Sequence, residues 1–308
     1  MEQNWWQNRE EWYYKIEVEK EVFTPGRPRP NFAAIRRLLR NINVRDMDCL
    51  DIGTMEGATP MLLKRAGAKS VVAYDRFMSG DKLPWLPELF KTYNANIDYI
   101  GGMRLEDFPL ALEKNRKDPL FDLVVFSGVL YHLINPLGYL ALARSFCKVG
   151  GLFVFETRVV HLPQEILIFN TKGFHGGGNT YFIVTTAWMD YALRMLGLRP
   201  LSAVYTGKIR KKRSFRLAIL CRSEAAPCPV DADDAWMRDD IHRRGFASEL
   251  LIDWERLQKT ESAIDVAPFE QPVINLENNQ SLFSALENPT DPYVPSEKEA
   301  ILTLDSTM

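Results

Sequence analysis

The sequence lacks a run of about 18–20 consecutive apolar residues, which a membrane-spanning helix needs. Residues 1–6 lack the basic-then-apolar order of a signal peptide. The four cysteines have neither the close spacing of a zinc site nor the density of a secreted disulfide scaffold. These absences predict a cytoplasmic protein with no metal site and no membrane contact. What is present is a chain of 308 residues, 46% of them hydrophobic, which is enough for a large buried core.

A strong net charge is absent too, because the formal total is only −2. That total hides an asymmetry. Residues 230–308 hold 17 acidic and 6 basic side chains, whereas residues 1–229 hold 23 acidic and 32 basic ones. The composition predicts three parts: an aromatic N-terminal segment (1–45), a central domain (46–229) and an acidic C-terminal extension (230–308) with a helix near 233–260.

A basic hairpin, defined here as residues 208–213, has five basic side chains in six positions. Such a tip can follow a nucleic-acid backbone, or it can be solvated, or it can dock the acidic extension. If the extension folds back on the basic hairpin, it covers the surface that RNA would use. That arrangement favours a small substrate.

The chain from 48 to 222 alternates short apolar runs with helical periods, which indicates an α/β fold with a mostly parallel sheet and helices on both faces. Expected strands lie near 49–52, 71–75, 97–100, 123–126, 152–156, 201–205 and 215–221, and the 123–126 run is apolar enough to be central. Helices are expected near 32–39, 58–65, 136–147 and 185–196.

Residues with chemical potential follow these strands. Asp51, Gly53, Thr54 and Gly57 form a glycine turn before a helix, where a backbone can pass close to a ligand. The turn lacks the third glycine of a dinucleotide-binding fingerprint and the lysine of a P-loop. Asp75 ends the second strand, where an acid reaches a ribose diol. The remaining candidates follow the third and fourth strands, where a purine ring and a reacting group would lie: Arg104, Leu105, Ser127, Gly128, Tyr131 and His132.

Over about residues 45–222 this order of motifs resembles the class I S-adenosylmethionine (SAM) methyltransferases. The resemblance implies a Rossmann-like, seven-stranded sheet with an antiparallel last strand. It also implies that SAM lies with its amino-acid portion on Gly53–Gly57, its ribose on Asp75 and its adenine near Arg104 and Leu105.

A narrower resemblance is to the bacterial tRNA wobble-uridine carboxymethyltransferase and its small-molecule relatives. It rests on residues 127–132, 135–137, 155–157 and 179–183, and on 12–14 and 23–26, which in such proteins fold over the cofactor as a lid. The glycine turn departs from the tRNA enzyme, and this departure favours ordinary SAM and a small acceptor.

The acceptor decides whether a base is needed. A hydroxyl or ammonium acceptor must lose a proton to a base such as His132, His161 or His175, with Tyr131 beside it, whereas a thioether has none to lose. Arg158 can pair with a carboxylate of an amino-acid-like acceptor or with a nearby acid of the protein. Tyr14, Asn179 and Tyr181 complete the predicted acceptor contacts. The leading hypothesis is methyl transfer to a small molecule such as an amino acid or a thioether. A tRNA modification enzyme and a non-catalytic SAM-binding regulator are the alternatives.

Overall fold

The computed structural model describes residues 6, 12–76, 85–115, 119–210, 213–230, 254–259, 261–270, 273–276, 278, 280–287 and 291–308. Among these residues no helix has the length and hydropathy needed to cross a bilayer. Most of the predicted 233–260 helix lies outside the described residues, apart from α8 (Trp254–Leu257).

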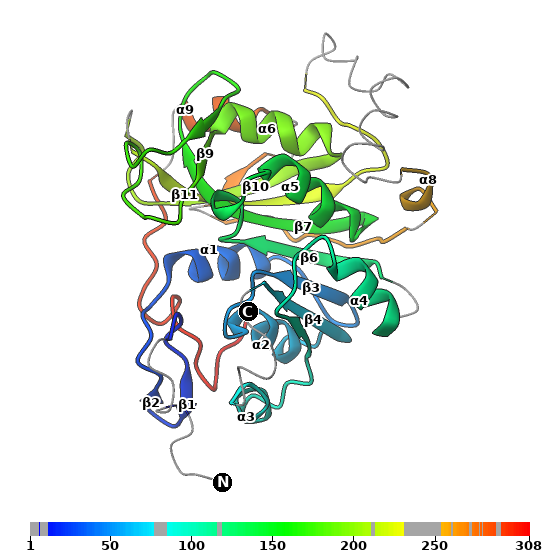
Figure 1. Ribbon diagram of the computed structural model, residues 1–308, viewed down its shortest axis with the longest axis vertical. Helices are drawn as coiled ribbons and strands as arrows, with labels where there is room; N and C mark the ends of the chain where they lie inside the picture. The colour runs from blue at the N-terminus through cyan, green and yellow to red at the C-terminus, as the bar shows by residue number, and fades with distance from the viewer. Residues whose placement is uncertain are drawn as a thin grey trace.

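The core of the molecule is a twisted, mostly parallel sheet (Figure 1). Its main path runs in the order β12-β10-β11-β7-β6-β3-β4-β5. The strands on this path are β3 (Asp48–Ile52), β4 (Ser70–Asp75), β5 (Asp98–Gly101), β6 (Phe121–Ser127), β7 (Cys147–Val160), β10 (Leu198–Thr206), β11 (Phe215–Ser223) and β12 (Ile274–Asn275). The strand β11 is antiparallel to both of its neighbours, which confirms the predicted antiparallel last strand of the domain.

The predicted number of strands was too small. Within the described residues the sheet has ten strands, not seven. The strand β12 comes from the C-terminal extension and pairs with the outer edge of β10. The strand β9 (Phe182–Thr185) pairs with the end of β7, and β8 (Leu167–Phe169) pairs with β9. These additions were missed because two-, three- and four-residue strands carry too little alternation to be read from sequence.

Helices cover both faces of the sheet, as predicted. On one face lie α1 (Pro30–Leu39), α2 (Ala58–Arg65) and α3 (Leu86–Thr92), and on the other α4 (Phe108–Asn115), α5 (Pro136–Ser145) and α6 (Thr186–Met195). Side chains alternate along each strand, so Cys49 packs under the first set and Leu50 under the second. The result is two apolar layers, to which the central strand β6 contributes a continuous buried apolar run over residues 123–126.

Local signals fix the helix ends near the carboxyl edge of the sheet. Asn135 caps α5 by accepting a hydrogen bond from the Gly138 amide, and Pro136 occupies the first turn. Thr185 caps α6 by accepting from the Trp188 amide, and Gly197, with a φ of +67°, follows its end. These caps hold the segments before α5 and α6 at the edge where the candidate site lies.

The segment from Lys15 to Phe23 meets the C-terminal segment. The N-terminal hairpin of β1 (Glu17–Glu19) and β2 (Val22–Phe23) lies beside the C-terminal segment, blue against red in Figure 1. The Glu17 amide donates to the Leu302 carbonyl, and the Leu302 amide donates to the Lys15 carbonyl. Residues 300–304 of the acidic extension therefore dock on the N-terminal segment.

The described part of the extension does not cover the basic hairpin. It follows the start of β7, then α1, the edge of β10 and α6, against which α9 (Leu282–Glu287) packs, before it reaches the N-terminal segment. No hydrogen bond or ion pair joins a described residue of 230–308 to Lys208, Arg210 or Arg213. Lys211, Lys212 and residues 231–253 lie outside the described residues. Apolar side chains such as Leu302 bury the described part of the extension elsewhere, and the masking stays a prediction for the rest.

Candidate active site

The glycine turn (residues 53–57) connects β3 to α2. Gly53 and Gly57 both have left-handed backbones, with φ of +86° and +80°. A Cβ on Gly53 would lie 2.2 Å from Cγ2 of Val129, and one on Gly57 would lie 2.8 Å from the ring of Phe90. The Gly53 amide donates to the Tyr74 carbonyl at the end of β4. Both glycines are therefore required by backbone conformation and by packing, and the turn is fixed to the neighbouring strand.

Two buried aspartates end the first two strands of the domain. Asp51 is 3% exposed and Asp75 is 4% exposed. Burial, opposed by the side chain of Thr54 and assisted by the negative charge of Asp75, raises the pKa of Asp51 to about 7. Oδ2 of Asp75 accepts a hydrogen bond of 2.9 Å from the Met55 amide. No described residue forms an ion pair with Asp51, so this acidic corner favours a cationic partner. Thr54, the other predicted residue of the turn, is buried beside it.

A third acid of the turn, Glu56, was missed in the sequence. It is fully buried, its Oε1 accepts a hydrogen bond of 2.8 Å from the Tyr13 amide, and its Oε2 accepts one of 3.4 Å from the Tyr14 amide. Tyr14 is itself buried, and burial followed by the charges of Tyr13, Asp51 and Glu56 raises its pKa. The aromatic N-terminal segment thus rests on the glycine turn. In the sequence, Glu56 stands out only as an acidic residue directly before Gly57.

The predicted purine contacts diverge. Leu105 is buried in the core, but the Arg104 side chain is 67% exposed and forms an ion pair of 2.8 Å with Glu106. The Tyr139 hydroxyl donates to the same carboxylate. In this structure Arg104 is engaged on the surface, while Leu105 belongs to the layer behind β4 and β5.

The ends of β6 and β7 are connected by polar contacts. The Gly128 amide donates to the Glu156 carbonyl, and Ser127 Oγ donates to Oε2 of Glu156 at 3.2 Å. Gly128 has a φ of +73°, which a side chain would strain. Ser127 and Gly128 therefore lie at the carboxyl edge, next to the turn from β3, as predicted.

A buried ion pair between Glu156 and Arg216 occupies this edge, and the sequence analysis missed it. Nε of Arg216 lies 2.7 Å from Oε1 of Glu156, and Nη2 lies 3.1 Å from Oε2. Burial opposes the charge on Arg216, but the Glu156 carboxylate outweighs it and raises the arginine pKa. Arg216 also donates to the Tyr131 hydroxyl at 3.4 Å, and burial raises the pKa of Tyr131 to about 12. The partners are 60 residues apart in the chain, so no local pattern announces the pair.

His132 has a defined tautomer. Its Nδ1 lies 2.6 Å from the Asn179 carbonyl oxygen, which can only accept, so Nδ1 carries the hydrogen and Nε2 keeps its lone pair. Burial lowers the pKa of His132, so the ring is neutral at neutral pH. The Tyr181 amide donates to the Tyr131 carbonyl and holds the loop of Asn179 beside the short helix η3 (Leu130–His132). His132 is arranged as a hydrogen-bond acceptor toward a ligand.

Arg158 and His175 belong to the same neighbourhood. Burial, then the charges of Arg158, Arg216 and His132, lower the pKa of His175. His161 is placed differently: its ring stacks on Phe283 of α9, and its Nδ1 lies 3.1 Å from Thr186 Oγ1. The structure therefore does not bring His161 together with the other predicted acceptor residues.

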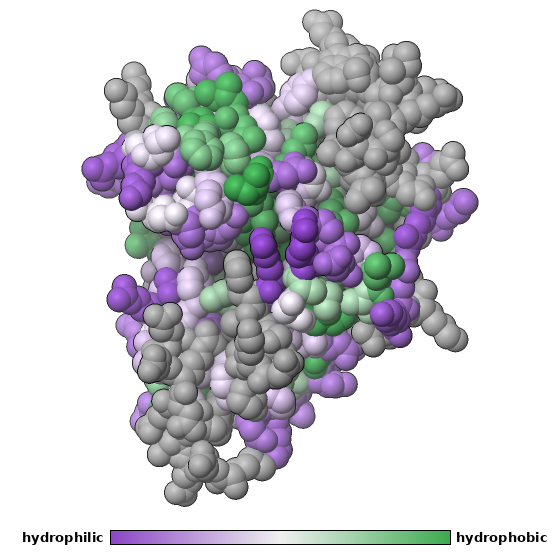
Figure 2. Space-filling model, in the orientation of Figure 1, coloured by the Kyte–Doolittle hydropathy of each residue, from purple (hydrophilic) through white to green (hydrophobic). Residues whose placement is uncertain are grey.

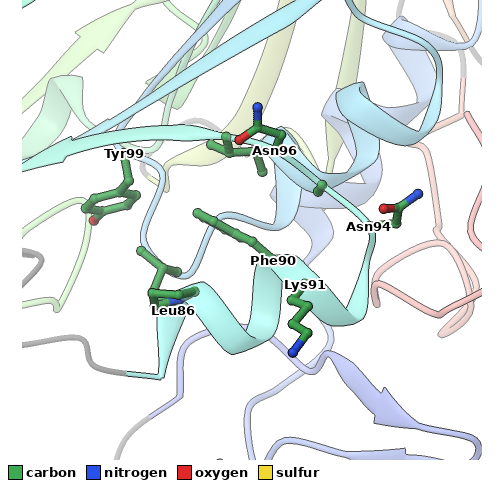
Figure 3. A pocket seen from close by; sticks show the side chains of 9 residues that line it. Leu86, Phe90, Lys91, Asn94, Asn96 and Tyr99 are labelled. Atoms are coloured by element: carbon green, nitrogen blue, oxygen red, sulfur yellow. The ribbon is translucent and has the colours of Figure 1, made fainter.

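Two apolar features flank this region. Figure 2 shows hydrophobic residues gathered over the part of the surface where Figure 1 places β9 and α9, and Ile166, Leu167 and Phe169 near β8 are exposed. A separate hollow lies between α3 and the edge strand β5, where Leu86 and Phe90 point toward the strand and Tyr99 lies across from them (Figure 3). The hollow adjoins the glycine turn only through Phe90, and it does not contain the polar cluster.

Comparison with known proteins gives a family. Residues 24–196 match the family model described as a methyltransferase domain. The tRNA U34 carboxymethyltransferase of Pseudomonas aeruginosa strain LESB58 is 29% identical over 168 residues, which cover 52% of this chain and 48% of that protein. The enzyme of the same name from Dichelobacter nodosus strain VCS1703A is 29% identical over 213 residues, 66% of this chain and 65% of that one. The chain spans about half the length of the first of these relatives.

Among solved structures, the N-terminal domain of EvdMO1, determined with SAH and D-fucose, aligns with a TM-score of 0.52 at 15% identity, covering 71% of this chain and 94% of that one. This likeness supports the fold. The chain belongs to the methyltransferase domain family, and SAM is the cofactor that the sequence resemblance implies. The residues of the site fit SAM. Asp51 and Asp75 suit a cationic molecule with a ribose diol, and the glycine turn lets the backbone come close to it.

Proposed function

We propose that the protein transfers the methyl group of SAM to a small acceptor whose nucleophile is a hydroxyl or an amine. The observation that carries the proposal is the His132 tautomer, in which Nδ1 donates to Asn179 and Nε2 is left as an acceptor. SAM supplies an electrophilic methyl on a sulfonium. An oxygen or nitrogen acceptor loses a proton as it attacks, and Nε2 of His132 is the group able to receive it. A thioether acceptor, which the sequence also allowed, would leave this arrangement without use.

We define the cofactor side as Asp51, Glu56 and Asp75 at the glycine turn. The residues there bind SAM and orient it. Asp75 suits the ribose hydroxyls, and Asp51 suits the positive end of the amino-acid portion. The backbone at Gly53 and Gly57 permits close approach. We also retain a cytoplasmic location as part of the proposal, since all four cysteines are free thiols.

The cofactor assignment is tested by calorimetry. Asp75→Asn keeps an oxygen for the Met55 amide but removes the charge, and it should weaken SAM binding about tenfold. Arg199→Gln, which alters a surface ion pair with Glu224, is the matched control and should bind normally. Equal affinity in wild type and Asp75→Asn would contradict the assignment of the ribose to Asp75.

The acceptor chemistry is tested by turnover. The wild-type protein is incubated with methyl-labelled SAM and a bacterial metabolite extract, and the labelled product is identified. His132→Ala should reduce turnover about 100-fold without changing SAM affinity. A labelled sulfonium product, or full turnover in His132→Ala, would overturn the proposed hydroxyl or amine acceptor.

A second candidate function is tRNA modification, and one observation favours it. Lys208, Arg210 and Arg213 are exposed, no described residue of the acidic extension covers them, and Ser214 at their base donates to the Phe174 carbonyl in the loop of His175. A gel-shift series with bulk tRNA at increasing salt tests it, because phosphate contacts weaken steeply with salt. Absence of a salt-sensitive complex would remove this candidate.

A further inference from the structure

Three charged side chains share one face of the sheet at the end of β7. Arg158 on β7 lies directly opposite Arg216 on the antiparallel strand β11. Glu156 precedes Arg158 by two residues, so its side chain leaves the same face. Two arginines therefore stand beside a single acid.

Both carboxylate oxygens of Glu156 accept hydrogen bonds from Arg216. Oε1 of Glu156 accepts from Nε of Arg216, and Oε2 accepts from Nη2 of Arg216 and from Ser127 Oγ. Arg158 forms no hydrogen bond or ion pair with any described residue. Burial, and then repulsion from Arg216, lower the pKa of Arg158. A partly buried guanidinium beside a second one, without its own counter-ion, is an unfavourable arrangement that an anion would relieve.

The described groups that surround Arg158 do not supply that anion. The charged and titratable neighbours within the described residues are Arg216, Tyr131, Glu156, Tyr13, His132 and His175. The raised pKa of Tyr131 and the lowered pKa values of His132 and His175 keep these three rings neutral at neutral pH, and Glu156 is paired. Since no described group supplies the negative charge, we expect it to come with a ligand.

We propose that Arg158 binds an oxyanion, a carboxylate or a phosphate, on the methyl acceptor, so that the enzyme selects small anionic acceptors. The assignment rests on the proposed function. The planar guanidinium offers two parallel N–H donors that match either group. The charges of Arg158 and His132 both lower the pKa of His175, so the two side chains lie in one neighbourhood. An acceptor held by Arg158 therefore lies near the proposed base. Arg158 is then a specificity-determining residue rather than a structural one.

The first experiment uses methyl-labelled SAM and a bacterial metabolite extract divided by anion exchange into retained and unretained fractions. Label should enter product only from the retained fraction. In Arg158→Gln the acceptor KM should rise about tenfold to a hundredfold, and Arg158→Lys should recover part of the loss. Arg199→Gln should behave as wild type. Labelling from the unretained fraction, or an unchanged KM in Arg158→Gln, would overturn the proposal.

The second experiment does not depend on turnover. Inorganic phosphate and acetate are each titrated into the protein saturated with S-adenosylhomocysteine. Saturable binding of at least one of them should occur in wild type and Arg199→Gln and be lost in Arg158→Gln, whose thermal midpoint should match wild type. Binding that survives in Arg158→Gln, or that is absent from wild type, would overturn the proposal.

The two experiments separate the possible failures. If the wild type labels no acceptor while phosphate binding still depends on Arg158, the proposed function fails and the oxyanion site stands. A carboxylate could also arrive on the transferred group, as the name carboxymethyltransferase implies for the relatives. If Arg158→Gln loses affinity only for a carboxymethyl sulfonium analogue of SAM, the anion belongs to the donor and the assignment to the acceptor is overturned.

Discussion

The two halves of the candidate site have opposite charge. The cofactor side presents buried carboxylates at the ends of β3 and β4, and one of them, Asp51, has its pKa raised to about 7. The acceptor side, defined as His132, Arg158, His175 and Arg216, presents cations and neutral rings near the ends of β6 and β7 and the start of β11. A sulfonium donor and an anionic acceptor would each find the opposite charge. The acceptor is therefore best sought among anionic molecules, which the carboxylates of the cofactor side would repel.

The largest effect is expected from the ion pair of the acceptor side. Glu156→Gln leaves Arg216 buried without its carboxylate, which should lower the free energy of unfolding by about 3–5 kcal/mol. Urea denaturation measures it. The double variant Glu156→Gln with Arg216→Met should recover part of the loss. A change below about 1 kcal/mol in the single variant would show that the pair does not stabilise this side.

On the cofactor side, loss of a negative charge should stabilise the fold instead of destabilising it, and pH reveals this effect. The carboxyl of Asp51 titrates near 3.8 when unperturbed and near 7 in the fold. Between these values the folded state keeps a proton that the unfolded state has released, so Asp51 makes the free energy of unfolding fall as pH rises from about 4 to about 7. Asp51→Asn should remove this fall, by at most about 4 kcal/mol. Urea denaturation of both proteins from pH 4 to 8 gives the difference, and parallel curves would refute it.

A smaller effect is expected where the N-terminal segment meets the glycine turn. Glu56→Ala removes the acceptor for two backbone amides and should cost about 1–3 kcal/mol, with faster hydrogen exchange at the amides of Tyr13 and Tyr14. Glu297→Ala, which breaks an exposed pair with Lys15 on the same segment, is the control. Unchanged exchange at the two amides in Glu56→Ala would show that other contacts hold the segment.

The smallest effect should come from Arg104. Its exposed pair with Glu106 contributes little, so Arg104→Ala should leave the thermal midpoint of unfolding where it is in wild type. SAM calorimetry on the same variant decides the sequence prediction that this residue lies at the purine. A clear loss of affinity would place Arg104 on the cofactor side in spite of its surface pair.

Except for Glu56, the positions of the cofactor-side residues were readable from the sequence because these residues are local. Asp51, Gly53 and Gly57 stand within one strand-turn-helix, and Asp75 ends the next strand, so periodicity alone places them at one edge. The order of the parallel strands and the helices on both faces followed from the same patterns. Here residues that are close in the sequence are also close in space.

The acceptor side was only half readable for the converse reason. Glu156 and Arg216 meet because β11 inserts antiparallel beside β7, and a pair 60 residues apart leaves no periodic trace. Arg158 was recognised, but its lack of a partner depends on Arg216 taking the acid. Net charge left the course of the acidic extension open, because burial of apolar side chains such as Leu302 decides where its described part packs.

The contact between the segment from Lys15 to Phe23 and the C-terminal segment bears on how the protein is made. Leu304 donates to Glu17, a contact that spans 287 residues, and Leu302 bonds to the same strand. During synthesis the N-terminal strand emerges early and waits for these partners until nearly the whole described chain has left the ribosome. Tyr13 and Tyr14, which rest on the glycine turn, belong to that waiting segment. The contacts that hold the segment of Tyr13 and Tyr14 are therefore completed only after residues 302–304 have been made, long after the glycine turn on which these tyrosines rest.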